Sequence, residues 1–599
     1  MEFETAARIV PHPDSRYTGN TERKRGAVHL DFILHYVKPY VKRVFGGTSL
    51  KFLGTILDLL IPWILAYIID TVSLQNDTNR VVMWGGVMVL CSLLAWVTNV
   101  LANRTAVGVA RDATRTLRHD LLQKITRLSG GEIDRFSIPS LISRMTTDSY
   151  NVYRVIGMSQ RIGIRAPILV IGGILMMLLL DPVLALILVA MLPFMALLVM
   201  YISRKGIPLY NRLQVTVDKL VRVVRENATG IRIIRALSKA QDEKLRFQDV
   251  NNDVAQSEMK ASMVMAVNGP IMRFLLNMGL VVVVIAGATR VNLGLTDVGK
   301  IIAFLNYFTI ILSAMLTITR ILTMASKAVA SANRIAAVID AREEEPGDET
   351  LTPDFSRPHI EFDHVTFSYN GNENALNDVS FAIQKGESLG VLGPTGAGKS
   401  TLIRLLMRFN QADAGSVKIF GQDVRDIPLE KLRGGIGVVF QNDTLFRGTI
   451  GDNVRLGRDI SDDEVNNAVR SAQAEDFVRG AGGPDAEVQT RGQNYSGGQQ
   501  QRILLARALA GTPDILLLDD SASALDFKTE AALRRELRRL KGFTSVIIAL
   551  RISAVMHCDK ILVLEDGEVR GIGAHRELLK TCPLYGEIAK LQLGGDVDA

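Results

Sequence analysis

Cysteine is scarce in this chain, which has only three such residues, Cys91, Cys558 and Cys582, among 599. No CxxC pair and no histidine–cysteine cluster occurs, which argues against a disulfide scaffold or a structural zinc site, so we expect these thiols to be packing residues. The first 25 residues are polar and charged and lack the basic start, apolar run and small-residue cleavage site of a secretory signal, so we expect none.

The composition points to a chain divided between two environments. A length of 599 residues exceeds the roughly 100 to 200 residues of an ordinary domain, so several domains are expected. Hydrophobic residues reach 48% and the mean hydropathy is +0.19, yet 22% of the residues are charged, too many for a protein lying wholly in lipid. The balance predicts a membrane part and a cytosolic part.

Six apolar stretches approach the roughly 20 residues that a helix needs to cross a bilayer. They are residues 47–72, 82–104, 163–180, 182–203, 263–288 and 301–326. The third and fourth meet at Asp181-Pro182, which predicts a tight helical hairpin. Six such runs in hairpin order argue against the alternative, buried helices of a large soluble protein.

Basic residues are distributed unevenly between the two sides of these spans. The long amphipathic stretches 105–162 and 204–262 contain repeated Lys and Arg, whereas the opposite connections contain few. The positive-inside rule therefore predicts that the long stretches and both termini are cytoplasmic. Basic segments beside an anionic lipid leaflet also account for the pI of about 9.2, and nothing resembles a base-reading module, so membrane lipid is the expected partner and nucleic acid is not.

A few polar side chains interrupt the predicted spans. Asp58 lies in the first and Arg273 in the fifth, and Asn277 and Asn306 add amides. An ionisable group at membrane depth faces a cavity or a partner. Asp58 is a candidate for a cavity or gate residue, with a helix–helix hydrogen bond as the open alternative; for the amides we favour packing.

The sequence divides into four predicted segments. Residues 1–28 form a cytoplasmic tail and 29–340 the membrane domain with its long cytoplasmic helices. An acidic, proline-containing linker follows at 341–357, and a second domain covers 358–599.

The second domain contains a P-loop. An apolar strand, a glycine-rich turn and a helix follow one another in SLGVLGPTGAGKSTLIRLL, which fits the pattern from Gly393 to Ser400. Glycines let the backbone wrap phosphates, Lys399 would reach the β- and γ-phosphates, and Ser400 would hold Mg²⁺. The predicted nucleotide-binding residues of this turn are Gly393, Thr395, Gly396, Ala397, Gly398, Lys399, Ser400 and Thr401.

Two downstream segments support this interpretation. DILLLDD at 514–520 reads as a buried strand, with Asp519 placed to hold Mg²⁺ through water. YSGGQQQRILLARAL opens a helix with Ser496, Gly497, Gly498 and Gln499, and a glycine-rich helix start is an anion site. It cannot reach a phosphate already enclosed by the P-loop of its own chain, so it requires a second nucleotide-binding domain.

With these motifs the chain resembles a half-transporter of the ATP-binding cassette (ABC) exporter family over residues 29–590. The SGGQ segment matches that family's signature. The resemblance implies six transmembrane helices followed by an α/β P-loop NTPase domain, with ATP and Mg²⁺ as cofactors. It also implies that Tyr369 stacks on adenine and that Gln441 links Mg²⁺ to the membrane domain. Ser523, Ala524, Leu525 and Asp526 match the D-loop.

The chain departs from the family at its catalytic positions. Asp520 stands where the family has the glutamate that polarises the attacking water, and shortening a carboxylate by one methylene moves it by roughly 1 Å, which can cost on the order of 10²-fold in rate. Leu550 stands where the family has a histidine that donates to the γ-phosphate, and losing one such donor costs about 10² to 10³. Thr490 replaces an expected acid before the signature. We therefore expect ATP binding with weak or no hydrolysis at this site.

The intact signature beside altered catalytic positions predicts a different partner subunit, one that supplies a Walker B glutamate and an H-loop histidine. The chain thus resembles the degenerate-site subunit of bacterial heterodimeric multidrug exporters, multi-pass proteins of the cell membrane. Residues 121–128 and 212–221 are the implied coupling helices, and a drug, lipid or peptide is the expected hydrophobic or amphipathic cargo. The alternatives are an ATP-gated channel or regulatory subunit, or a homodimeric exporter with low ATPase activity.

Overall fold

The chain forms two compact units. The computed structural model describes residues 30–75, 77–345, 347, 353–369, 371, 373–521, 524–540 and 542–593, so the predicted tail at 1–28 lies outside the described residues. The first unit comprises Met1–Lys124 with Pro139–Asp340, and the second comprises Ile125–Ile138 with Ala341–Ala599. The two units are therefore not strictly consecutive in sequence, because the segment Ile125–Ile138 belongs to the second unit.

The first unit is helical. Its helices are α1 (Leu30–Val37), α2 (Val41–Tyr67), α3 (Thr78–Arg127), α5 (Ile138–Ser143), α6 (Ser149–Met158), α7 (Arg165–Leu180), α8 (Pro182–Ala236), α9 (Ala240–Ala266), α10 (Asn268–Asn292) and α11 (Val298–Ile339). Among the described residues, six helical stretches are long and apolar enough to cross a membrane, and each of the six predicted spans coincides with one of them in whole or in large part. This confirms the six apolar helices of the predicted fold class.

The connections within this unit follow from local chemistry. The α7–α8 hairpin turns at one residue, because the Asp181 carboxylate accepts hydrogen bonds from the backbone N–H groups of Val183 at 3.0 Å and Leu184 at 3.2 Å, and proline follows as the first helical residue.

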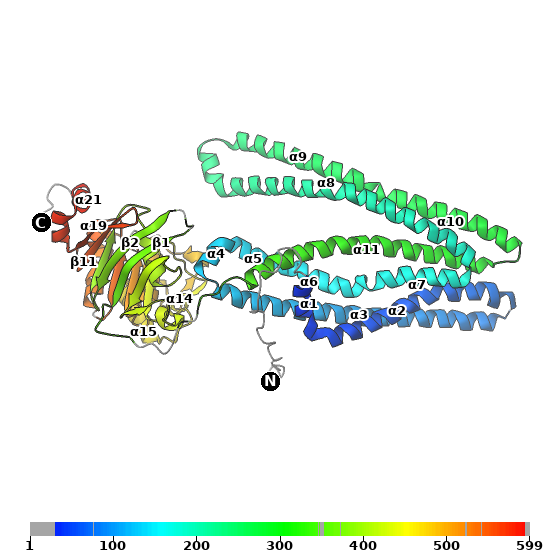
Figure 1. Cartoon of the computed structure of the whole chain (residues 1–599), viewed down its shortest axis with the longest axis horizontal. Helices are drawn as coiled ribbons and strands as arrows, with labels where there is room; N and C mark the ends of the chain where they lie inside the picture. The colour runs from blue at the N-terminus through cyan, green and yellow to red at the C-terminus, as the bar shows by residue number, and fades with distance from the viewer. Residues whose placement is uncertain are drawn as a thin grey trace. The chain divides into compact units, whose positions relative to one another are not determined.

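The helices α2, α7 and α11 run side by side (Figure 1). Buried Tyr307 on α11 joins two of them by donating its hydroxyl proton to the carbonyl of Leu59 on α2 at 2.6 Å.

The second unit is built on two main sheets. Strands β2, β1, β4 and β5 form an antiparallel sheet, and β12, β11, β3, β10, β9 and β6 form a mixed sheet in that order. The strands are β1 (Ile360–Ser368), β2 (Asn374–Ile383), β3 (Ser388–Leu392), β4 (Ala414–Ile419), β5 (Gln422–Asp423), β6 (Ile436–Val439), β7 (Gly448–Thr449), β8 (Glu487–Val488), β9 (Ile515–Asp519), β10 (Thr544–Ile548), β11 (Lys560–Glu565) and β12 (Glu568–Gly573). The helices are α4 (Gly130–Phe136), α12 (Lys399–Leu406), α13 (Leu429–Gly434), α14 (Ile450–Arg455), α15 (Asp462–Ser471), α16 (Glu475–Ala481), α17 (Gly497–Leu509), α18 (Phe527–Arg539), α19 (Ile552–Val555), α20 (His575–Thr581) and α21 (Pro583–Leu593).

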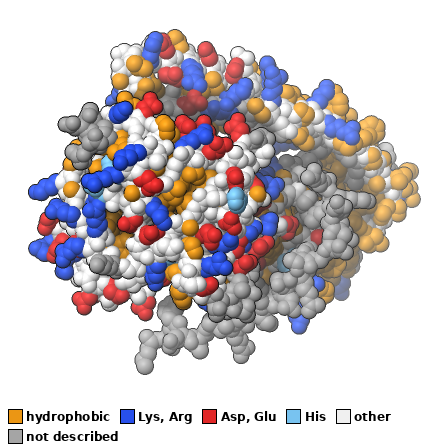
Figure 2. All heavy atoms as spheres, turned by 60° about the vertical axis from the view of Figure 1, so that its left-hand side comes forward, with side chains coloured by type: hydrophobic (Ala, Val, Ile, Leu, Met, Phe, Trp, Pro, Cys, Tyr) orange, Lys and Arg blue, Asp and Glu red, His pale blue; other side chains and the backbone are white. Residues whose placement is uncertain are grey.

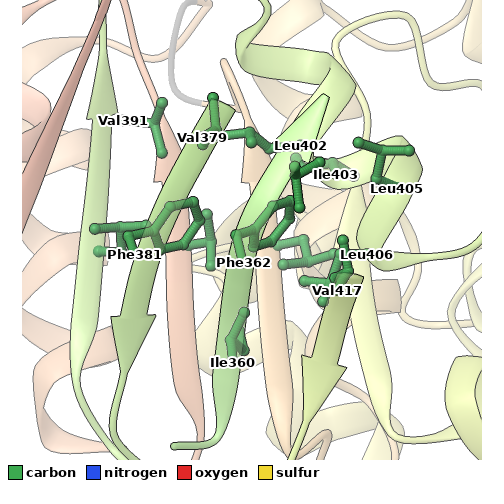
Figure 3. Packing of buried hydrophobic residues seen from close by; sticks show 14 of the residues in the cluster. Ile360, Phe362, Val379, Phe381, Val391, Leu402, Ile403, Leu405, Leu406 and Val417 are labelled. Atoms are coloured by element: carbon green, nitrogen blue, oxygen red, sulfur yellow. The ribbon is translucent and has the colours of Figure 1, made fainter. Parts of the chain in front are cut away.

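The core of this unit fixes the helix that follows the P-loop. Leu402 and Leu406 of α12 pack with Phe362 and Phe381 of the antiparallel sheet and with Val391 of β3 (Figure 3). The two phenylalanine rings stack with centroids 4.6 Å apart. Burial of these apolar side chains anchors α12, and with it the end of the P-loop, on the core of the unit.

The surfaces of the two units differ in kind. Large exposed hydrophobic side chains are concentrated in the membrane unit, from Leu34 to Val298. Figure 2 shows Lys, Arg, Asp and Glu side chains spread over the visible face of the second unit and many hydrophobic side chains on the helices of the first unit. This contrast agrees with a membrane part and a water-exposed part.

Candidate nucleotide-binding site

The P-loop lies between β3 and α12. Gly396 and Gly398 both have φ of +92°, a conformation that favours glycine, and a Cβ on Gly398 would lie 2.3 Å from the carbonyl oxygen of Ala375. The Lys399 ammonium folds back over the turn and donates to the carbonyls of Gly393 at 2.8 Å and Pro394 at 2.7 Å. The glycines therefore permit the tight turn, and the Lys399 ammonium lies over it, where it could donate to a phosphate chain.

Three parallel strands bring the remaining groups to the same edge of the sheet. Strand β10 lies between β3 and β9, and its Ile548 is level with Val391 on one side and Asp519 on the other. The carboxyl ends of parallel strands in such sheets are where ligands bind. Asp519 at the end of β9 and Leu550 just beyond β10 consequently reach the same place as the P-loop.

Opposite charges lie close together at the base of the site. Asp519 is buried, and burial raises the pKa of its carboxyl, whereas a hydrogen bond from the Ser400 hydroxyl and the nearby Lys399 act in the opposite direction. Burial likewise lowers the pKa of Lys399, while Asp519 and Asp520 oppose that shift. A hydroxyl and a carboxylate in contact are the hard oxygen ligands that Mg²⁺ prefers.

These groups line one cleft of about 700 Å³. Its walls include most of the predicted nucleotide-binding residues together with both altered positions, namely Tyr369, Thr395, Gly396, Gly398, Lys399, Ser400, Thr401, Gln441, Asp519, Asp520 and Leu550. Gly393 shapes the turn as the acceptor for Lys399, and Ala397 is buried beneath it. The glycine turn, the lysine and the Ser400–Asp519 pair fit a nucleoside triphosphate with its Mg²⁺.

Tyr369 lies at the rim of the cleft and is 45% exposed. Its ring packs edge-on against Phe367, its hydroxyl lies 3.1 Å from that of Thr401, and the guanidinium of Arg404 lies 5.8 Å from its ring centroid. One side chain thus has both a fixed position and accessible aromatic surface, as stacking on a base requires.

The two altered catalytic positions are held firmly. Asp520 has φ of +48° and donates its backbone N–H to the carbonyl of Ile548 at 3.0 Å. Leu550 is 44% exposed, and Gln592 of the final helix fixes its backbone by donating to the Leu550 carbonyl at 3.0 Å and accepting from the N–H of Ile552 at 2.8 Å. Gln592 lies 42 residues from Leu550 in sequence, and no motif around Leu550 predicted this contact.

The signature segment forms the start of α17. Ser496 caps this helix: its hydroxyl accepts from the N–H of Gln499 at 3.4 Å, and the Gln499 side chain accepts from the N–H of Ser496 at 2.9 Å. A Cβ on Gly498 would approach the carbonyl oxygen of Ala524 to 3.0 Å, which explains the glycine. Gly497 lies in the first turn, so the predicted segment is a well-formed helix N-terminus.

The predicted D-loop is only partly described. Ser523 lies outside the described residues. Asp526 caps α18 by accepting from the N–H of Thr529 at 2.9 Å and from its hydroxyl at 2.7 Å, and the bond from this N–H lowers the pKa of Asp526. Thr490, the residue in place of an expected acid, begins a short 3₁₀ turn just before the signature.

The predicted coupling segments need revision. The turn between the long helices α8 and α9 lies at residues 237–239, whereas 212–221 is the uninterrupted middle of α8, so that prediction was wrong. Residues 121–127 are the end of α3, and the segment that joins the nucleotide unit is Ile125–Ile138 with its short helix α4.

Helix α4 packs closely on other parts of the nucleotide unit, to which it belongs. A Cβ on Gly130 would lie 2.2 Å from the carbonyl oxygen of Phe409, and Asp134 lies 3.7 Å from Arg404, whose guanidinium also faces Tyr369. The carbonyl of Arg127 accepts from the N–H of Glu344 at 3.0 Å. This helix therefore touches the helix that follows the P-loop.

Asp58 lies on a separate cavity in the membrane unit, where its carboxylate pairs with Arg165 at 2.9 Å. Asp58 therefore both lines a cavity and joins α2 to α7, so the two interpretations offered for this residue are compatible. Arg273 and Asn306 are exposed in the chain.

Comparison with known proteins agrees with this architecture. Family models described as "ABC transporter transmembrane region" and "ABC transporter" match residues 44–315 and 376–523. The chain is 36% identical over 566 residues to the uncharacterized ABC transporter ATP-binding protein YfiB of Bacillus subtilis, covering 94% of this chain and 98% of the relative. It is 31% identical over 502 residues to a fatty acid ABC transporter ATP-binding/permease protein of Mycobacterium bovis, covering 83% and 79%.

A solved structure, that of a bacterial Atm1-family ABC exporter with ATP bound, matches with a TM-score of 0.76. It is 24% identical and covers 93% of this chain and 99% of that one. The match shows that the two chains share a fold.

Proposed function

The chain belongs to the ABC transporter family, with a membrane unit and an ATP-binding unit in one polypeptide, and on that basis we propose that it is one subunit of a heterodimeric exporter. The complex couples ATP binding and hydrolysis to outward transport, and the site built on this chain's own P-loop hydrolyses slowly. The subunit is a multi-pass protein of the cell membrane, with its termini and its nucleotide unit on the cytoplasmic side.

The observation behind this proposal is the position of Asp520 and Leu550. Both line the cleft that contains the P-loop, beside Lys399, Ser400 and Asp519. The groups expected to bind a triphosphate are therefore present. The groups expected to support hydrolysis are not, because a leucine side chain offers no hydrogen-bond donor and the Asp520 carboxylate is shorter than that of a glutamate by one methylene.

The metal and the nucleotide each have identifiable ligands. Lys399 and the P-loop N–H groups would hold the phosphates, Tyr369 the base, and Ser400, Asp519 and Gln441 the Mg²⁺, which neutralises charge on the phosphates when bound. Within this arrangement the chain's own residues bind and orient the nucleotide. Asp520 would hold the attacking water less well than a glutamate, so the proton transfer that activates the water is slow.

The partner follows from the signature surface. ABC exporters work as dimers, in which each nucleotide lies between the P-loop of one subunit and the signature of the other. The capped start of α17 at Ser496 is intact and suits a triphosphate held by the partner's P-loop. A homodimer would contain two slow sites, so we propose a partner that supplies a glutamate and a histidine at one competent site.

The proposed cargo is hydrophobic or amphipathic, as for drugs, lipids or peptides. One relative's name specifies a fatty acid transporter, and a fatty acid is an amphipathic lipid.

Photolabelling with a radioactive azido-ATP tests the assignment of sites. The chain is coexpressed with a candidate partner half-transporter that has the glutamate and the histidine, and the complex is purified. The nucleotide trapped during one turnover is then analysed on each subunit. We expect triphosphate on this chain and diphosphate on the partner. Diphosphate formed on this chain at the partner's rate contradicts the slow-site proposal.

A further inference from the structure

The membrane unit contains a second large hollow, a cavity of about 590 Å³ lined by α2, α3, α7, α11 and the turn before α7. Its polar wall contains Lys51, Asp58, Arg161 and Arg165. The rest of the lining includes hydroxyl groups of α11 and the side chains of Leu169 and Ile310.

The charges in this wall do not cancel. The Asp58 carboxylate accepts from the Arg165 guanidinium at 2.9 Å, which accounts for one of three cations. Lys51 is 3% exposed and donates to the side-chain oxygen of Asn103 at 3.1 Å, and Arg161 donates to the carbonyl of Gly157 at 3.2 Å; both acceptors are neutral. Three cations against one carboxylate leave an excess of two positive charges facing the cavity.

The arginine that pairs with Asp58 also has unused donor capacity. The Nε atom of Arg165 is buried and has no hydrogen-bond partner among the described residues. A guanidinium has five N–H donors in a planar fork that matches the two oxygens of a carboxylate or phosphate. An ion pair whose only role was to join two helices would require neither the second arginine nor the lysine.

The position of the charges along the helices suits an amphiphile. Arg165 begins α7, and the opposite end of that helix is capped by the Asp181 turn. Lys51 and Asp58 are seven residues apart on α2, which places them on one face, about 10 Å apart along the helix axis. The basic wall is therefore at one end of the spans, and Leu169 continues the cavity wall one turn further into α7.

We propose that this cavity binds the anionic headgroup of an amphipathic cargo, with a carboxylate or phosphate held by Arg161, Arg165 and Lys51 and its apolar tail beside Leu169 and Ile310. The inference rests on the proposed export function and names the cargo class. Asp58 holds Arg165 in place and, by neutralising one cation, keeps the site from holding an anion too tightly to release.

Binding of matched twelve-carbon amphiphiles tests this directly. The full chain in neutral maltoside micelles is titrated with laurate, dodecyl phosphate or dodecanol, and apparent dissociation constants are obtained from thermal shifts. We expect the two anions to bind about tenfold or more tightly than dodecanol. Preference for laurate or for dodecyl phosphate identifies the headgroup, whereas equal binding of all three overturns the proposal.

Substitutions assign the effect to the cavity. Arg161→Gln with Arg165→Gln should weaken anion binding at least about tenfold, whereas Arg104→Gln, which removes an exposed arginine next to Asn103 and outside the cavity lining, should leave it unchanged. Asp58→Asn keeps all three cations and should tighten anion binding. This second variant keeps the proposal testable if the double variant does not fold. Wild-type anion affinity in both the double variant and Asp58→Asn contradicts the assignment.

These measurements need neither ATP nor a partner, so their failure is distinct from failure of the proposed function. The latter is tested by ATP-driven export from vesicles containing the coexpressed complex.

Discussion

The nucleotide unit presents two surfaces that we propose bind phosphate, the P-loop cleft and the signature segment, and they differ in which of the family's residues they retain. The P-loop cleft keeps its binding groups but has Asp520 and Leu550 at the positions that support hydrolysis. The signature surface keeps its glycines and the reciprocal cap between Ser496 and Gln499. Under the proposed function each surface serves a different nucleotide, so slow turnover at the P-loop site would leave the signature surface able to support hydrolysis at the other site.

The largest expected effect comes from Ser496→Arg. The substitution removes the Ser496 hydroxyl, which accepts a hydrogen bond from the N–H of Gln499. The long arginine side chain also fills the space through which the signature would meet the partner's nucleotide. We expect steady-state ATPase activity of the complex to fall on the order of 10²-fold or more. Activity close to that of the wild-type complex would show that this surface does not serve the competent site.

Repair of the slow site should produce the next largest change. Asp520→Glu with Leu550→His returns a longer carboxylate and a donor, and we expect single-turnover hydrolysis on this chain to rise on the order of 10- to 100-fold, more than either single change gives. The partner's catalytic glutamate is changed to glutamine so that only this site is observed. Nucleotide that stays intact in the double variant, with an unaltered partner signature, shows that another feature limits the site.

Lys399→Ala should have a smaller effect than Ser496→Arg on the same steady-state assay. In the proposed complex Lys399 holds the slowly hydrolysed nucleotide, so its loss should weaken closure without disabling the competent site, and we expect activity to fall on the order of a fewfold. The equivalent P-loop lysine of the partner is the matched control, and its change to alanine should abolish activity. A greater loss from Lys399→Ala than from Ser496→Arg would reverse the assignment of the two surfaces.

The smallest effect concerns the base. Tyr369→Ala should weaken ATP binding by this chain about tenfold, since stacking on a base is worth about 1 to 3 kcal/mol. Tyr369→Phe keeps the ring and loses only the contact with Thr401, so its affinity should stay within about threefold of wild type. Titration with a fluorescent ATP analogue measures both, and equal losses in the two variants would indicate that the hydroxyl, not the ring, supports binding.

The nucleotide cleft was predictable because its chemistry is local in sequence. A strand, a glycine turn and a helix fix Lys399 and Ser400 together, and a single apolar strand ends at Asp519. The six spans followed from hydropathy, and the Asp181 hairpin from a turn dipeptide.

Contacts that depend on tertiary packing could not be predicted in this way. Helix α8 runs for 55 residues with no stop signal near 212–221, so the true turn at 237–239 was missed. The link from Gln592 to Leu550 spans 42 residues. Lys51, Arg161 and Arg165 lie near the ends of spans, where basic residues fit the positive-inside rule, and only the packing of α2 against α7 shows that they share one cavity with Asp58.

The most direct test of the central claim is the steady-state ATPase activity of the purified chain by itself and in complex with its partner. We predict little activity from the chain alone and restoration on coexpression with a subunit that has the glutamate and the histidine. Turnover of the chain alone at about 1 per second or faster, typical of an ordinary enzyme, would contradict the slow-site account.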